Sequence, residues 1–168
     1  MIQGTELLPG WRLVVEERTP NHWVAACRDV VLLVAYEGSS DDVRHIQTTT
    51  RVIERVGREL GPTVKLLFVV PPVHAKPPSA EVRSAIVRDF RRISAYVSRG
   101  AVVVAGSGFG AAVHRGAATG VLALVRPAFP VTVHRGLSEG LAYLLGSEHE
   151  AMKPLAQACE RVLDHDAA

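Results

Sequence analysis

A glycine-rich turn at residues 106–111 has the residue types and spacing that come nearest to a known chemistry in this chain. Gly106, Gly108 and Ala111 fit the pattern G-x-G-x-x-A between a predicted strand and a predicted helix. In dinucleotide-binding folds, such glycines let the backbone approach a pyrophosphate that sits on the helix N-terminus. Here one strand follows, and it ends in a histidine and an arginine where an acidic ribose ligand is expected. The pattern therefore predicts a tight structural turn.

The alternative for this turn is a binding site for a small ligand, either a nucleotide or a lipid. The free backbone N–H groups at a helix start favour an anionic group, which both ligand classes carry. The candidate ligand-binding residues of this alternative are Gly106, Ser107, Gly108 and Gly110.

Candidate catalytic and metal-binding residues do not form a complete set in the sequence. His114 and His134 follow neighbouring predicted strands, so we expect them near one another at the carboxyl edge of the sheet. Neither an H-x-x-x-H nor a C-x-x-C spacing accompanies them. Ser107 lies outside any G-x-S-x-G elbow, and no carboxylate pair suits acid–base chemistry. The chain is therefore expected not to be an enzyme and to have no cofactor or metal; an enzyme using these three residues is a further alternative.

A proline-rich segment at residues 71–78 and the helix start that follows it form a candidate partner-binding region. Prolines cannot donate to a sheet, so the segment is expected to be an exposed loop. Ser79 is placed to cap the next helix. A phosphate on Ser79 would also be stabilised by the helix N-terminus, which makes Ser79 a candidate phosphorylation site. The candidate partner-binding residues of this segment are Pro72, His74, Lys76 and Ser79.

Arginines lie mostly outside the apolar stripe of the helix that Ser79 opens. Guanidinium groups on one helix face bind acidic proteins or anionic lipid headgroups, whereas a solvated face is the alternative. The arginines of this predicted helix are Arg83, Arg88, Arg91, Arg92 and Arg99, and the first four are the candidate partner-binding residues.

The elements that must position these residues alternate between apolar strands and amphipathic helices. Strands are predicted at 11–16, 23–27, 30–37, 64–70, 101–105 and 131–133. Helices are predicted from a cap at Ser40 or Asp41 to Gly61, from Ser79 to Gly100, and at 111–125, 137–145 and 148–163. This order predicts one α/β domain at 1–146, with a four- to five-stranded mixed sheet flanked by helices, and a C-terminal helical extension at 147–168.

Composition narrows the classes of partner and compartment. The 168 residues carry a formal net charge of +2, and aromatic residues make up 5%, which argues against a nucleic-acid surface. The apolar runs have strand length, so no integral membrane segment is expected. Without a secretory signal pattern at the start, and with Cys27 and Cys159 outside any C-x-x-C motif, we expect free thiols and a cytoplasmic location.

Four segments, at 30–38, 79–83, 100–107 and 130–145, resemble the STAS-like superfamily of anti-sigma-factor antagonists, and most closely its stand-alone bacterial STAS/SEC14-like branch. The resemblance covers about residues 10–146. It implies a mixed sheet with helices and a role in binding or regulating other proteins. It also implies that Ser79 stands where antagonists carry a phosphorylated Ser or Thr, although residues 71–78 replace the family's Asp-Ser-Ser-Gly-type turn.

The sequence thus predicts a non-catalytic regulatory or scaffolding module that acts in signalling through protein–protein interaction. Phosphorylation of Ser79 is its candidate switch, and a homodimer is one candidate assembly. The contact surface is expected to include the proline-rich loop, the arginine face of the next helix and the C-terminal helix.

Overall fold

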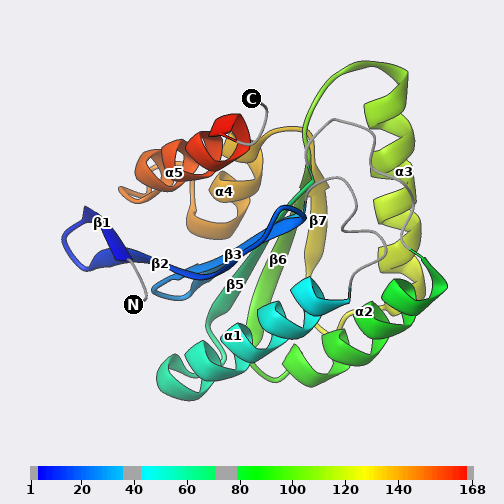
Figure 1. Ribbon diagram of the computed structural model, residues 1–168, viewed down its shortest axis with the longest axis horizontal. Helices are drawn as coiled ribbons and strands as arrows, with labels where there is room; N and C mark the ends of the chain where they lie inside the picture. Colours follow the sequence, from blue (N-terminus) through cyan, green and yellow to red (C-terminus); the bar gives the residue numbers. More distant parts are fainter. Residues whose placement is uncertain (1–3, 36–42, 71–78, 166–168) are drawn as a thin grey trace.

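A computed structural model describes residues 4–35, 43–70 and 79–165, and the strands within these ranges form one seven-stranded mixed sheet (Figure 1). The strands lie in chain order, with the first four antiparallel and the last three continuing in parallel from the fourth. Their bounds are β1 (Gly4–Leu8), β2 (Trp11–Arg18), β3 (His22–Cys27), β4 (Val30–Ala35), β5 (Val64–Val70), β6 (Val97–Val104) and β7 (Val131–His134).

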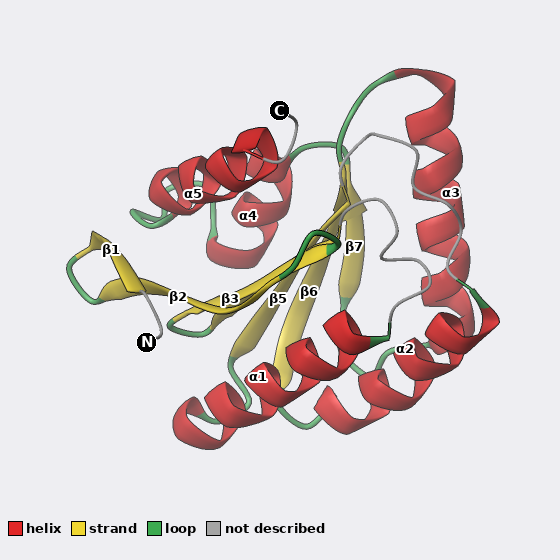
Figure 2. Cartoon of the chain, in the orientation of Figure 1, coloured by secondary structure: helices red, strands yellow, loops and turns green. Residues whose placement is uncertain are grey.

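Helices supply the crossovers that parallel neighbours require. The first three connect the strands from β4 to β7, and the last two follow β7 and cover the opposite face of the sheet (Figure 2). The helix α2 packs mainly on α1, and α3 stands beside β7 and next to α2 (Figure 1). The bounds are α1 (Arg44–Leu60), α2 (Ala80–Ile93), α3 (Gly108–Val125), α4 (Leu137–Leu145) and α5 (Met152–His165).

The central strands are buried on both faces, as their unbroken apolar sequences predict. On one face Leu32 and Leu67 pack with Leu141 of α4, and α5 contributes to the same cluster through Leu155. On the other face the neighbouring residues of these strands pack against α1, whose Ile53 is fully buried. Two hydrophobic layers therefore enclose the sheet.

The predicted architecture is confirmed in its main features. The chain forms a mixed sheet flanked by helices, and the helix predicted at 137–145 has those bounds. Gly61 follows the end of α1 with a φ of +81°, and its N–H donates to the carbonyl of Gly57 at 2.9 Å. Ser79 caps α2, since its hydroxyl accepts from the N–H of Val82 at 3.2 Å.

The number of strands was predicted too low, since the sheet has seven rather than four or five. The two hairpins at the N-terminal end join the same sheet as the parallel strands, because β4 belongs to both parts. The first strand, β1, is short and half-exposed, with no alternating pattern that would predict it.

The prediction that a helix runs to Gly100 is wrong. The helix α2 ends at Ile93, and β6 begins at Val97 and contains Gly100 as a buried strand residue. The spacing from Ile93 to Val97 suits a helix, but pairing of Val97 with Val64 of β5 places it in the sheet. A Cβ at Gly100 would lie 3.3 Å from Cγ2 of Val131, so the absence of a side chain at Gly100 lets Val131 of β7 pack closely against β6.

Several other element ends differ from the prediction by a few residues. The glycine turn is shorter than expected, because α3 begins at Gly108 rather than at residue 111. The last helix begins at Met152 rather than at residue 148, and the last strand extends to His134. The predicted caps Ser40 and Asp41 lie outside the described residues.

Gly140 of α4 generates a stability prediction. A Cβ at this position would lie 2.6 Å from Cγ2 of Val103, which is fully buried in β6. We expect Gly140→Ala to lower the free energy of unfolding by about 1–3 kcal/mol, because α4 must move off the sheet. Gly116→Ala is the matched control, since a Cβ there meets nothing within 4 Å, and it should raise stability by up to about 1 kcal/mol. Urea denaturation measures both, and equal stability of the two variants would contradict this packing.

Candidate functional site

The glycine turn before α3 has the geometry of a structural turn. Gly106 and Gly108 have φ angles of +101° and +88°, which favour glycine. Arg115 of α3 donates to two carbonyl oxygens near the turn, that of Val104 at 3.4 Å and that of Gly106 at 3.2 Å. The turn residues from Gly106 to Gly110 are exposed, and Ser107 makes no side-chain cap. These contacts favour the structural interpretation, and the small-ligand alternative stays a prediction.

The candidate catalytic residues are not joined in the structure. His134 lies 2.6 Å from Oγ1 of Thr132, and its ring contacts Tyr143 at 5.4 Å between centroids. His114 is half-buried on α3, and no hydrogen bond, ion pair or ring contact links it to His134 among the described residues. Within the same ranges, no three His, Cys, Asp or Glu side chains form a group that could hold a metal ion.

Both cysteines are free and buried, one in β3 and the other in α5. Burial raises the pKa of Cys27 to about 11 and outweighs the nearby charge of Arg28, which lowers it, while the charge of Asp29 adds a smaller increase. Burial raises the pKa of Cys159 to about 12, and the charge of Glu160 acts in the same direction. Neither side chain is therefore a ready nucleophile near neutral pH.

Because both cysteines are buried, we expect their thiols to react slowly with a disulfide reagent in the folded protein. Because the thiolate is the reactive form, a pKa raised from 9.0 to about 11 leaves about 100-fold less thiolate at pH 8. We expect a disulfide reagent such as DTNB to label native protein at least about 100-fold more slowly than protein unfolded in urea. Rapid stoichiometric labelling of one thiol in native protein would contradict the burial of that cysteine.

A buried polar cluster between β2, β3 and α1 was not predicted from the sequence. His22 is fully buried, and its Nε2 lies 3.1 Å from a carboxylate oxygen of Glu17. The hydroxyl of Thr48 donates to the other oxygen of Glu17 and accepts from Arg51 at 2.8 Å. The ring of His45 stacks obliquely against His22 at 5.6 Å. The cluster fastens the first turn of α1 to the hairpin beneath it.

The contacts within this cluster lower the pKa of Glu17. Burial raises the pKa, but the contacts with Thr48 and His22, together with the charges of His22 and Arg51, outweigh burial and lower it. A lowered carboxyl pKa contributes stability above the ordinary value of 4.5 and loses it as pH falls through the folded-state pKa. The polar side chains of this cluster face one another, which suits attachment of a helix to the sheet.

The predicted partner-binding arginines divide into two groups. Asp89 of α2 is 2% exposed and is paired by Nε of Arg88 at 2.8 Å and by the hydroxyl of Thr50 at 3.1 Å. Arg92 pairs with Glu54 of α1 at 2.9 Å. Arg92 therefore helps to hold α2 against α1, whereas Arg88 pairs within α2 with the buried carboxylate that bonds to Thr50, and both arginines are also exposed. Arg91 has no side-chain partner among the described residues, so its charge is available to a partner.

The remaining predicted residues are placed differently. Arg99 belongs to β6 instead of α2, where it donates to the carbonyl of Tyr143 at 3.3 Å and lies over that ring. Pro72, His74 and Lys76 lie outside the described residues.

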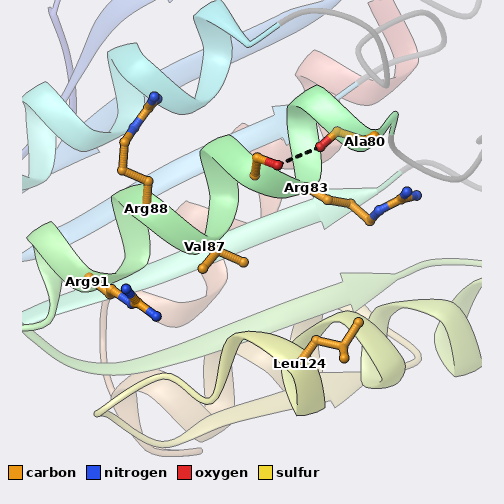
Figure 3. A pocket seen from close by; sticks show the side chains of 7 residues that line it. Ala80, Arg83, Val87, Arg88, Arg91 and Leu124 are labelled. Atoms are coloured by element: carbon orange, nitrogen blue, oxygen red, sulfur yellow. Dashed lines mark hydrogen bonds between the residues drawn. The ribbon is translucent and has the colours of Figure 1, made fainter.

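An open groove of about 520 Å³ separates α2 from α3 (Figure 3). Val87 of α2 and Leu124 of α3 form its apolar part and face the groove from opposite helices (Figure 3). The hydroxyl of Ser84 turns back to the carbonyl of Ala80 at 2.9 Å, so it is already satisfied. The described residues that line the groove include three arginines and no acidic residue. They are Ala80, Arg83, Ser84, Val87, Arg88, Arg91 and Leu124.

The helix α3 exposes its large apolar side chains, whereas an ordinary surface helix buries them. Its exposed large side chains are Phe109 at 86%, Val113 at 51% and Leu124 at 78%. Its arginine points back to the turn, and across the whole of α3, all of which is described, only Ala111 is buried. A surface helix normally turns its apolar stripe inward and its charges outward. Within the described ranges, the outer face of α3 therefore has no packing partner that suits its apolar side chains.

Sequence reasoning missed this exposed face. The small-residue run at 111–125 was read as a helix, but its period carries no strong inward stripe that would show which side packs. The sequence feature that could have indicated the exposed face is the composition of α3, whose 18 residues include one arginine and no acidic residue. By length and composition, α3 is also the one helix among the described residues that could cross a membrane.

Comparison with known proteins identifies no relative, because no family model, curated protein or solved structure matches this chain. The STAS-like resemblance stays a prediction from the sequence.

Proposed function

We propose that this protein is a non-catalytic regulatory or scaffolding module that acts by binding another protein. The observation that carries the proposal is the exposed apolar face of α3 beside the arginines of α2. Large exposed apolar patches rimmed by polar residues are typical of interaction surfaces. Arginine is also enriched where protein interfaces have their strongest contacts.

Ser79 supplies a candidate switch for the proposed surface. It caps α2 directly before Ala80, which lines one end of the groove, and Arg83 lies one turn further along. A phosphate on Ser79 would add a charge of about −1.5 to −2 at this end. It would interact favourably with the helix N-terminus and reduce the positive potential that an acidic partner meets. Phosphorylation is therefore proposed to weaken partner binding.

Charge reversal at Arg91 tests the proposed function. The structure favours Arg91 over Arg88 and Arg92, whose reversal would also remove partners of Asp89 and Glu54 and so disturb the fold. We expect Arg91→Glu to weaken capture of the native protein partner from lysate of the source cells by at least about tenfold. Arg12→Glu is the matched control, since Arg12 is an exposed arginine on β2, outside the groove and outside the expected contact surface.

Affinity capture with quantitative mass spectrometry provides the measurement. A protein retained in stoichiometric amount by the wild-type and Arg12→Glu baits, and lost from the Arg91→Glu bait, is the expected result. Identical capture by all three baits, or the absence of any stoichiometric protein, would contradict the proposal.

A further inference from the structure

We infer that the groove between α2 and α3 binds an amphipathic helix of a partner protein, with acidic side chains flanking that helix's apolar face. The inference rests on the proposed function and specifies the chemistry of the partner. It follows from the apolar stripe of α3, the charge of α2 and the concave shape between them.

The apolar part of the surface is a continuous stripe. Phe109, Val113 and Leu124 fall within about 60° of one another around the axis of α3, at 100° per residue. Ala117 and Gly120 lie on the same side between Val113 and Leu124. Leu124 also lines the groove, so the stripe leads directly into it. A partner with apolar side chains spaced one turn apart would bury this stripe along its length.

The positive charge of the groove determines which side chains we expect beside the apolar face of the partner helix. Arg83, Arg88 and Arg91 line the groove, and α3 contains no acidic residue. Arg88 is paired with the buried Asp89 at 2.8 Å, whereas Arg91 has no side-chain partner among the described residues, so its charge is available to a partner. Charge complementarity therefore requires Asp or Glu beside the apolar face of the partner. A second copy of this chain would bring the same arginines together, which disfavours self-association through this groove.

The shape of the surface favours a helix over a lipid bilayer. A groove between two helices accepts a third helix, whose convex side chains fill the hollow. Gly116 and Gly120 leave open space where a Cβ would stand, so a partner backbone can approach α3 closely. Insertion into lipid relies on many large apolar side chains, whereas the exposed face of α3 has three among alanines and glycines.

A display library of random 18-residue peptides, selected on the full-length protein, tests the inference. We expect enriched peptides to carry apolar residues at i, i+3 or i+4 and i+7 with Asp or Glu on the flanks. Their affinity should fall at least about tenfold in Leu124→Ser and in Arg91→Glu. Leu60→Ser is the matched control, because Leu60 is an exposed leucine at the end of α1, 50% exposed and outside the groove.

Several results would overturn the inference. It fails if no peptide is enriched, if enriched peptides lack acidic flanks, or if Leu124→Ser binds them as wild type does. Leu124-dependent binding to phosphatidylserine vesicles but not to phosphatidylcholine vesicles, without peptide binding, would assign the surface to lipid. A dimer in sedimentation velocity that Leu124→Ser abolishes would assign it to a second copy.

The proposed function and this inference fail separately. If the native partner is lost from Arg91→Glu but retained by Leu124→Ser, the protein is a binding module whose partner does not use the groove in this way. If the native partner is retained by both variants, the proposed surface is also wrong.

Discussion

Burial of the central strands on both faces is the constraint on which the rest of this structure depends. Every residue of β4 is buried, and β5 and β6 are largely so, which requires a helical layer on each side of the sheet. The helix α1 supplies one layer, and α4 with α5 supplies the other. The last crossover leads only to β7, a four-residue edge strand that is half-buried. Little sheet is left for α3 to cover, so its apolar outer face stays exposed.

The attachment of α2 explains why the arginines beside α3 are not equivalent. Because α2 packs mainly on α1, buried Asp89 needs partners at that contact, and it has them in Thr50 and Arg88. Arg92 reaches Glu54 on the same side. Loss of Arg88 would leave a buried carboxylate without its cation and strongly destabilise the protein, and loss of Arg92 would remove an ion pair between α2 and α1. The outward side of α2 then supplies charge to the groove through Arg91, which has no side-chain partner among the described residues.

The sequence was sufficient to predict the elements that follow strong local rules. Unbroken apolar runs identified the buried strands, and the cap at Ser79 and the glycine at position 61 marked helix ends that the structure contains. Gly100 was misassigned because its role arises from contact with β7, which is distant in sequence. The cluster of His22, Glu17 and Thr48 and the exposed face of α3 depend on tertiary placement in the same way. No local spacing shows which side of a small-residue helix meets the sheet.

Photo-crosslinking from position 124 in the source cells tests the central claim most directly, because it reports what touches the groove without any need to purify the partner. Benzoylphenylalanine replaces Leu124, which is 78% exposed, in one variant and Leu60, a leucine that is 50% exposed and outside the groove, in the other. The account predicts a covalent adduct with a different protein from position 124 alone, mapped to an acidic amphipathic helix of that protein. Adducts of equal yield from both positions, or no protein adduct from position 124, would contradict it.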